Sequence, residues 1–154
     1  MIEIANFKTV KITDIVCDFN GTIAKDGVVL PEIKGLFEQL SKKYTLHVIT
    51  ADTFGSVHSQ LKEYNTNIKV LSSDNHTKEK AQYVSTLGAD NCIALGNGNN
   101  DKEMLRLAAI GISILGDEGC AKDALLSSDL TCKHITEAFD LLLHTKRLVA
   151  TLRR

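Results

Sequence analysis

The chain has 154 residues, of which 44% are hydrophobic, and a net charge of −1. This length and composition fit a single domain, residues 1–154, with a substantial core. Charges are spread along the sequence and no basic patch is interleaved with aromatic residues, which argues against nucleic acid as a partner. The start of the chain is too short and too charged for a signal peptide, and no apolar run could span a membrane. We therefore expect a cytoplasmic protein with no membrane partner.

The first clear element is a mainly apolar segment over residues 12–16, which leads into Asp18 and breaks at Asn20-Gly21. We predict a strand over about residues 14–19, because a short and mainly apolar segment is typical of a strand buried on both faces of a parallel sheet. Gly21 provides the backbone freedom that a sharp exit turn requires. Asp18 then lies at the carboxyl end of a central strand, where open α/β sheets bind ligands. Taken alone, this aspartate would be better explained as a helix or turn cap.

The sequence that follows alternates between extended and helical patterns. An Asp-Gly turn within residues 23–29 indicates a hairpin, and Pro31 opens a helix with an apolar stripe from Ile33 to Leu40. Further strands are predicted at residues 46–49, 68–71, 91–95, 110–115 and 129–131. A second helix is predicted from the apolar stripe Phe54, Val57, Leu61 and Tyr64. Further helices are predicted at residues 77–87, 104–108 and 121–126, and from about Ile135 onward. This alternation predicts an α/β fold with a doubly wound, mainly parallel sheet.

Four cysteines are widely spaced, and no two of them form a CxxC pair. They are Cys17, Cys92, Cys120 and Cys132. The spacing indicates neither a zinc site nor a redox pair. We expect buried free thiols, as is usual in a reducing compartment. Cys17 precedes Asp18 in the predicted strand, so the two side chains should point to opposite faces of the sheet.

Polar or glycine-rich segments follow the predicted strands at four places. They are residues 18–22, residues 50–53, the loop before Lys80, and residues 96–101. In a doubly wound sheet these segments face one crevice. Phosphoryl transfer could use Asp18 as nucleophile, Thr50 as hydroxyl donor and Lys80 as neutralising cation. Asp101 can bind Mg²⁺ together with Asp18, because this ion prefers hard oxygen ligands.

The same segments resemble four motifs of the haloacid dehalogenase (HAD) superfamily, in the order in which that family carries them. Asp-Phe-Asn-Gly-Thr at 18–22 is similar to motif I, DxDxT, whose first aspartate accepts the phosphoryl group. Thr50 matches the hydroxyl residue of motif II, and Lys80 with the helix after it resembles motif III. Gly-Asn-Gly-Asn-Asn-Asp at 96–101 resembles the GDGxND of motif IV. The likeness covers about residues 12–132.

Within the superfamily, Thr50-Ala51-Asp52 and residues 111–130 resemble the phosphorylation domain of P-type ATPases, here in a soluble, free-standing form. The resemblance implies a Rossmann-like HAD core and a Mg²⁺-dependent phosphohydrolase (phosphatase) with an aspartyl-phosphate on Asp18. The resemblance implies that the substrate phosphate is bound by Thr50, Ala51 and Lys80. It also implies that the metal is bound by Asp18, the backbone carbonyl of Asn20, Asn97 and Asp101.

Two amides stand where the superfamily usually carries carboxylates. Asn20 occupies the position of the second aspartate of motif I, which protonates the leaving group and later activates water. An amide does neither near neutral pH, so we expect slow turnover. P-type ATPases also lack this aspartate, and there a separate domain supplies the glutamate for hydrolysis. Asn97 occupies the position of a metal-binding aspartate, so we expect it to contribute an amide oxygen or a bridging water and to bind Mg²⁺ more weakly.

Other interpretations stay open on the sequence alone. A HAD fold without turnover, serving as a binding or regulatory module, is favoured by Asn20 and Asn97. A receiver domain also combines Asp, Thr, Lys and Mg²⁺, but its acceptor follows the third strand, whereas Asp18 follows the first. Lys78 is a weaker candidate than Lys80 for the motif III lysine. His47 lies within a predicted strand and is expected to be a packed residue rather than a ligand.

No segment of domain size separates motif I from motif II, or motif II from Lys80. HAD enzymes for small substrates usually carry a cap domain there, so the resemblance implies a capless core. Such a core acts on a large phosphorylated substrate, for example a macromolecule, or uses a second subunit as its lid. The last predicted helix has more apolar residues than one stripe needs: Ala138, Phe139, Leu141, Leu142 and Leu143. Packing on its own sheet explains most of them, and a homo-oligomer surface is the alternative.

Overall fold

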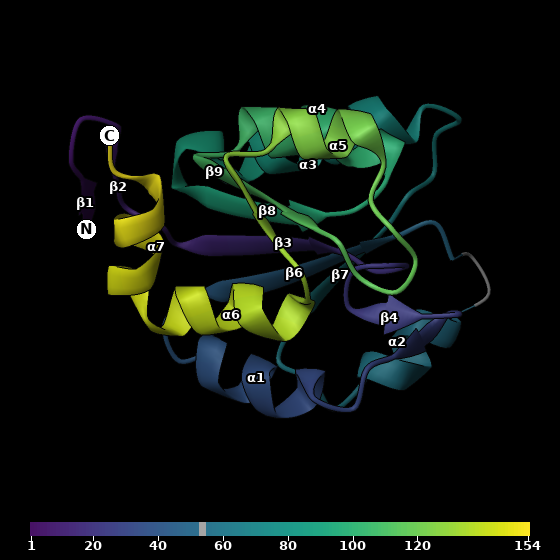
Figure 1. Cartoon of the computed structure of the whole chain (residues 1–154). Coiled ribbons are helices and arrows are strands. Elements are labelled where there is room, and N and C mark those ends of the chain that lie inside the picture. The colour runs from purple at the N-terminus through teal and green to yellow at the C-terminus, as the bar shows by residue number, and fades with distance from the viewer. Residues whose placement is uncertain (53–54) are drawn as a thin grey trace.

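The computed structural model describes residues 1–52 and 55–154. Its centre is a six-stranded sheet in which all neighbouring strands pair in parallel, in the order β10-β9-β8-β3-β6-β7. The strands are β3 (Asp14–Asp18), β6 (Thr45–Thr50), β7 (Asn67–Val70), β8 (Cys92–Gly96), β9 (Ile110–Ile114) and β10 (Leu130–Cys132). The predicted α/β class is thus confirmed, with β3 in the interior of the sheet (Figure 1).

Helices cover both faces of this sheet (Figure 1). One face carries α3 (His76–Leu87), α4 (Lys102–Leu107) and α5 (Lys122–Ser127). The other carries α1 (Ile33–Leu40), α2 (Ser56–Leu61) and α6 (Ile135–Leu143). Two single turns of 3₁₀-helix, η1 (Ala89–Asn91) and η2 (Asn99–Asp101), flank β8. This is the doubly wound arrangement that alternating strands and helices predict.

The core consists of two apolar clusters, one on each face of the sheet. Side chains of β3 alternate between them: Ile15 and Cys17 belong to the cluster shared with α1 and α6, and Val16 to the cluster shared with α3 and α4. Asp18, two residues after Val16, therefore points toward the α3 side. Cys17 is buried on the opposite side, as predicted, and burial raises the pKa of its thiol far above the ordinary value. All four cysteines are free thiols, and only Cys120 is partly exposed.

The hairpin predicted after the first strand is present as β4 (Ala24–Lys25) and β5 (Val28–Val29). Asp26 and Gly27 form its turn with φ values of 52° and 77°. These positive values explain the Asp-Gly pair, which type I′ turns favour. Between β3 and α1 the chain forms no other named element.

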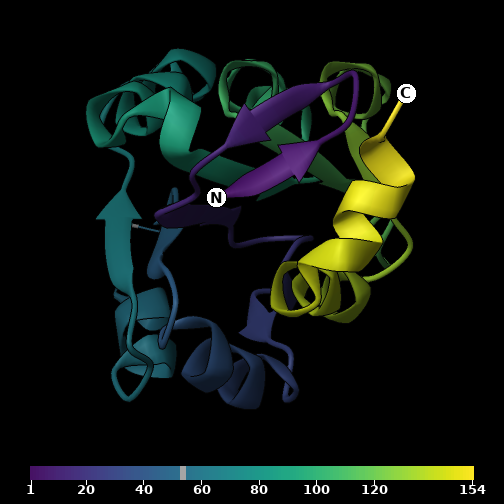
Figure 2. The same ribbon diagram turned by 90° about the vertical axis from the view of Figure 1, so that its left-hand side faces the viewer.

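Two terminal features differ from the prediction. An antiparallel hairpin of β1 (Ile2–Ile4) and β2 (Lys8–Val10) precedes the sheet, and its three-residue strands are too short to produce a recognisable alternation. The last helix is interrupted at His144, after which α7 (Thr145–Leu152) follows. Figure 2 shows this hairpin beside α7. Arg154 N donates to Ala5 O at 3.0 Å, which ties the end of the chain to the hairpin turn.

Most other boundaries shift by one or two residues, as expected where helix ends fray. The second helix is shorter than predicted, because α2 ends at Leu61 and Tyr64 of the predicted stripe lies after it. Pro31 precedes α1, whose first residue is Ile33. The stripe predicted for the second helix includes Phe54, which lies outside the described residues together with Thr53. Within the described ranges, no helix combines the length and the apolar character that crossing a membrane requires.

Candidate active site

The site forms around Asp18, at the carboxyl end of β3. Its neighbours in the sheet hold this strand end in place: Asp18 is in register with Ile49 of β6, and Phe19 N donates to Ile49 O at 3.1 Å. Immediately afterwards the chain turns back, with Gly21 at φ 76°. The turn brings the Thr22 hydroxyl to 3.4 Å from Asp18 Oδ2. The strand end and its turn therefore hold Asp18, which is 8% exposed, at the edge of the sheet where β3 ends.

Lys80 lies at the centre of the site. It comes from α3, is 3% exposed, and its Nζ donates to Asp18 Oδ1 at 2.9 Å, to Asp101 Oδ1 at 2.8 Å and to Asn100 Oδ1 at 2.9 Å. These bonds use all three protons of the ammonium group. A buried charge needs such partners, because an unpaired ammonium in the interior is very costly.

The carboxylates near this lysine outnumber it. Burial, followed by the negative charge of Asp101, raises the pKa of Asp18 to about 7, and the nearby Lys80 only partly opposes this rise. Burial alone would lower the pKa of Lys80, but the two carboxylates outweigh it and the pKa is raised. The cluster of two aspartates and one lysine thus has a surplus negative charge when all three are ionised. A further cation beside Asp18 would be electrostatically favourable.

Asp101 is fully buried, and both of its carboxylate oxygens accept hydrogen bonds from protein donors. Oδ1 accepts from Lys80, and Oδ2 accepts from the backbone N–H groups of Asn97 at 3.0 Å and Gly98 at 2.9 Å. Gly96 leaves the room for this arrangement, since a Cβ there would lie 2.5 Å from the Asp101 carboxylate. Asp101 therefore shapes the loop after β8 and orients Lys80. Its assignment as a metal ligand stays a prediction.

Asn97 faces Asp18 across the Thr22 hydroxyl, which lies 3.4 Å from Asn97 Oδ1. Its amide nitrogen donates to Gly119 O at 3.1 Å, which directs the oxygen toward the crevice. The amide also packs against Gly21, where any Cβ would clash with it. The described residues contain no group of three or more His, Cys, Asp or Glu side chains placed to share a metal ion. The Asp18 carboxylate and the Asn97 amide oxygen thus lie on either side of the Thr22 hydroxyl, each 3.4 Å from it.

Motif II lies on the neighbouring strand. Thr50 ends β6, is 2% exposed, and its hydroxyl oxygen accepts from Asp52 N at 3.0 Å. Because the oxygen is the acceptor in this bond, the hydroxyl proton can be donated elsewhere. Asp52 Oδ2 accepts from Val57 N at 3.0 Å, near the start of α2. Ala51 is exposed between them.

The choice between two lysines follows from their places on α3. Lys78 is exposed, whereas Lys80 is buried against Asp18. The loop before α3 is held by Glu79, whose carboxylate accepts from Ser72 N at 3.0 Å and Ser73 N at 2.8 Å. The Ser73 backbone and side chain, followed by the Ser72 backbone and Lys69, lower the pKa of Glu79 to about 2.

The site includes three side chains that the sequence analysis did not identify as functional residues. Thr22 and Asn100 contact the predicted residues directly, and Glu79 orients the loop before Lys80. Thr22 and Asn100 belong to the predicted motifs I and IV, so their positions were visible but their contacts were not. The side chain of Asn20 is exposed, and its backbone pairs with Ala24.

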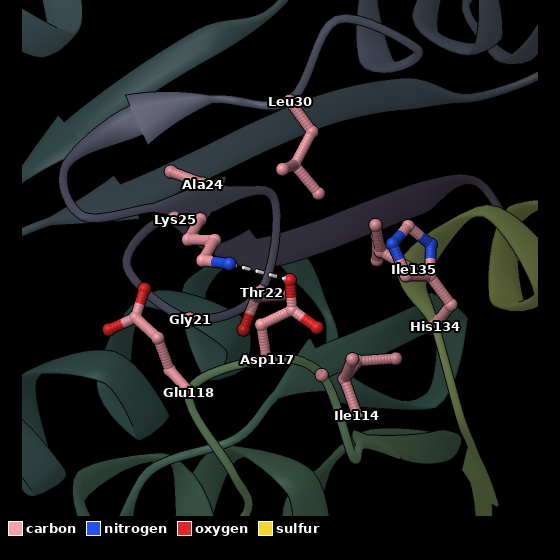
Figure 3. A pocket seen from close by; sticks show the side chains of 11 residues that line it. Gly21, Thr22, Ala24, Lys25, Leu30, Ile114, Asp117, Glu118, His134 and Ile135 are labelled. Atoms are coloured by element: carbon pink, nitrogen blue, oxygen red, sulfur yellow. Dashed lines mark hydrogen bonds and ion pairs between the residues drawn. The ribbon is translucent and has the colours of Figure 1, made fainter.

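The hairpin β4–β5 covers one side of the site. Lys25 Nζ forms an ion pair with Asp117 Oδ2 at 3.0 Å (Figure 3). Asp26 N donates to Glu118 Oε2 at 3.2 Å, and the two contacts join the hairpin to the loop after β9. A cavity of about 20 Å³, lined in part by Gly21 and Thr22, lies beneath this contact. It is large enough for about one water molecule.

Solved structures share this architecture. A hydrolase of the HAD superfamily (subfamily III A) from Legionella pneumophila superposes with a TM-score of 0.71 at 14% identity, covering 90% of this chain and 86% of that one. The 3-deoxy-D-manno-octulosonate 8-phosphate phosphatase of Moraxella catarrhalis, in complex with magnesium, phosphate and the sugar acid, gives 0.70 at 19% identity, covering 92% and 94%. The chain has the HAD fold.

A third structure with the HAD fold is the cobalt-bound phosphatase of the same name from Haemophilus influenzae, with a TM-score of 0.72, 10% identity and coverage of 87% and 88%. In sequence, an uncharacterised protein of Methanocaldococcus jannaschii is 52% identical over 61 residues, which are 40% of this chain and 66% of that protein. No family model matches. In the HAD fold described here, motifs I to IV correspond to the ends of β3 and β6, to α3 and to the loop after β8.

Proposed function

We propose that this protein is a Mg²⁺-dependent phosphohydrolase that acts on a phosphorylated substrate through an aspartyl-phosphate on Asp18. The observation that carries the proposal is the position of the Lys80 ammonium group, 2.9 Å from Asp18 Oδ1. A cation at this distance from a carboxylate nucleophile can bind an equatorial oxygen of an incoming phosphoryl group by exchanging one of its three present hydrogen bonds. The likeness to HAD phosphatases supports the same reaction class.

In the proposed first step, an Asp18 carboxylate oxygen attacks the phosphorus of a phosphate monoester. A P–O bond to Asp18 forms while the P–O bond to the leaving alcohol breaks, and the leaving oxygen takes a proton from solvent. Lys80 and Thr50 would donate to the phosphoryl oxygens, and the exposed Ala51 N–H lies next to Thr50 in the chain. In the second step, water attacks the same phosphorus, the P–O bond to Asp18 breaks, and inorganic phosphate leaves.

Mg²⁺ fits the donors that face the opening beside Asp18. The Asp18 carboxylate and the Asn97 amide oxygen both lie near the Thr22 hydroxyl, and the surplus negative charge of the cluster favours a cation. Hard oxygen donors with room for waters suit this ion. We infer that Asp18, the backbone carbonyl of Asn20 and Asn97 would hold it, and that Asp101, the fourth predicted ligand, would join them by exchanging one of its present hydrogen bonds. When bound, Mg²⁺ would neutralise developing charge on the phosphoryl group.

Slow turnover is proposed from the chemistry of position 20. No carboxylate occurs there to protonate the leaving group or to deprotonate water, and general acid–base help is worth typically about 10² to 10⁴-fold.

The hairpin beside position 20 is short, and the substrate side of the crevice is covered by no larger element between β3 and α1. We therefore propose a large phosphorylated substrate, and the P-type ATPase-like character of the motifs belongs to the same proposal.

The test is steady-state hydrolysis of an aryl phosphate, with and without Mg²⁺, by the wild type and by Asp18→Asn. We expect slow hydrolysis that requires Mg²⁺ and disappears in the variant. Incubation with acetyl phosphate followed by intact-mass measurement should reveal one phosphoryl group on the wild type and none on Asp18→Asn. Hydrolysis that persists in Asp18→Asn would contradict the proposal.

The alternative is a binding or regulatory module without turnover. The exposed amide of Asn20 is the observation that favours it, because the position is accessible but chemically inert. Under this alternative the protein would bind inorganic phosphate in the presence of Mg²⁺ but would neither hydrolyse an ester nor accept a phosphoryl group.

A further inference from the structure

A hydrogen-bonded network of three polar residues joins α3 to two strands of the sheet. His47 of β6 is 4% exposed, and its Nε2 lies 2.7 Å from Asp14 Oδ1, at the start of β3. Its Nδ1 lies 2.8 Å from the Tyr83 hydroxyl on α3. The rings of His47 and Tyr83 meet edge to face, with centroids 5.5 Å apart. His47 is thus packed, as its place in a strand predicts, but it is also the centre of a hydrogen-bonded chain.

The hydrogen-bonding chemistry gives this chain a direction. An ionised Asp14 carboxylate can only accept, so His47 Nε2–H donates to it, and in the neutral imidazole Nδ1 then keeps a lone pair. The Tyr83 hydroxyl then donates to Nδ1. Thr13 Oγ1 completes the set by donating to the other Asp14 oxygen at 2.6 Å. Among the described residues, no buried side-chain nitrogen or oxygen lacks a partner, so this polar chain is fully satisfied.

Each member lies three or four residues from a site residue on the same element. The pairs are Asp14 and Asp18 on β3, His47 and Thr50 on β6, and Tyr83 and Lys80 on α3. A displacement of α3 along the sheet would therefore have two effects at once: it would break the contact of Tyr83 with His47, and it would move Lys80 relative to Asp18. The two contacts are nearly one helical turn apart on a rigid element.

Helix α3 has little apolar surface with which to define its own position. Of its 12 residues, only Lys80 and Val84 are buried. Tyr83 and Leu87 are partly buried against the same cluster. A core-facing helix usually takes its position from a broad apolar stripe, which tolerates small rotations and shifts. Hydrogen bonds lose strength steeply when their length or angle changes, so the Tyr83 contact restricts movements that Val84 alone would allow.

We propose that Asp14, His47 and Tyr83 are positioning residues that fix α3 on the sheet and thereby hold the Lys80 ammonium group between Asp18 and Asp101. The inference rests on the proposed function in one respect, namely that Lys80 binds the phosphoryl group. The residues themselves touch neither substrate nor metal. Their effect on phosphate binding passes through Lys80 and should vanish when that lysine is removed.

The test is a double-mutant cycle with inorganic phosphate as the ligand, in the presence of Mg²⁺, measured by calorimetry. Its members are the wild type, Tyr83→Phe, Lys80→Met and the double variant. We expect Tyr83→Phe to weaken phosphate binding by about tenfold, a usual size for coupling within one network, and to have no effect in the Lys80→Met background. Equal weakening in both backgrounds, or none in either, would overturn the inference and leave the proposed function intact. Lys80→Met that binds phosphate like the wild type would overturn both.

Tyr44→Phe is a matched control, because the Tyr44 hydroxyl also makes a part-buried bond, to Leu142 O at 3.1 Å, away from the site. It should lower the melting temperature about as much as Tyr83→Phe but leave phosphate binding unchanged. A second measurement does not depend on the folding of Lys80→Met. In aryl phosphate hydrolysis, Tyr83→Phe and His47→Gln should both alter kcat or KM well below their melting temperatures. If both keep wild-type kcat and KM while melting earlier, the network is only structural and the inference is overturned.

Discussion

Around Asp18, the side of the site formed by Lys80 differs from the side formed by Thr22 and Asn97 in contact length and charge. On the lysine side, Nζ makes three contacts of 2.8 to 2.9 Å to side-chain oxygens, two of them from carboxylates. On the threonine side, the hydroxyl of Thr22 lies 3.4 Å from both Asp18 and Asn97. One side is charged and has short contacts, whereas the other has longer contacts and carries amides where the HAD superfamily usually has carboxylates.

The difference separates two parts of phosphoryl transfer that are normally found together. Capture of a phosphoryl group needs a cation and a nucleophile, the roles that we propose for Lys80 and Asp18. Release needs proton transfer and a strongly bound metal, which would depend on position 20 and on Asn97. We therefore expect substitutions on the lysine side to remove function and suitable substitutions on the other side to increase it.

The largest effect is expected for Lys80→Met. Loss of a donor to the developing charge typically costs about 10² to 10³-fold in turnover, and Asp18 would also lose its cation. We expect a decrease of about 10³-fold in kcat/KM for an aryl phosphate. Lys78→Met is the matched control, because Lys78 is exposed on the same helix. A similar loss in Lys78→Met would show that the assignment of the motif III lysine is wrong.

Asn20→Asp should act in the opposite direction. The change is nearly isosteric and restores a group that can give and take a proton, so we expect turnover in Mg²⁺ to rise by at least about tenfold. The Asp18→Asn, Asn20→Asp double variant should be inert, since the gain requires the nucleophile. If Asn20→Asp folds, binds Mg²⁺ and hydrolyses no ester, the binding-module alternative replaces the phosphatase proposal.

Asn97→Asp should tighten Mg²⁺ binding by about tenfold, because a carboxylate is a stronger ligand for this ion than an amide oxygen. Calorimetry with Mg²⁺ measures the change. Asn99→Asp adds the same charge to the same loop at an exposed position and serves as the control. Equal tightening in both variants would mean that general charge, rather than coordination by residue 97, is responsible.

The smallest effect concerns Glu79 and stability. The hydrogen bonds from Ser73 and Ser72 lower the pKa of Glu79 from 4.5 to about 2. A carboxyl group with a lowered pKa in the folded state stabilises the fold above its unfolded pKa, and this contribution is lost as the pH falls toward 2. We expect Glu79→Gln to lower the free energy of unfolding by about 1 kcal/mol at pH 7, which corresponds to a decrease of about 3 °C in melting temperature.

The pH dependence distinguishes this origin from lost packing. The difference between Glu79→Gln and the wild type should shrink between pH 4.5 and 2, because over this interval the carboxylate is protonated in the unfolded chain but still ionised in the folded protein. Thermal unfolding followed by circular dichroism at several pH values measures it. A difference that stays constant down to pH 2 would rule out the charge as its source.

Several features of this protein follow from the sequence by itself. The mainly apolar segment before Asp18 predicts a buried strand, because local hydrophobicity is enough to indicate it. The Asp-Gly pair at 26–27 predicts a hairpin, because these residues favour the backbone conformation of its turn. The alternation of strands and helices then restricts the chain to a doubly wound sheet whose strand ends meet. For this reason the order of the motifs was enough to bring Asp18, Lys80 and Asp101 to one crevice.

The contacts within that crevice required the tertiary structure. Lys78 and Lys80 are two residues apart with the same chemistry, and only the placement of α3 over β3 decides which one is buried against Asp18. Asp101 looks like a metal ligand in the sequence, yet the fold of its own loop directs one of its oxygens to backbone N–H groups. His47 meets Asp14 and Tyr83 across 33 and 36 residues of chain. Such pairings depend on strand order and helix position, because local patterns carry no information about which distant side chain lies opposite.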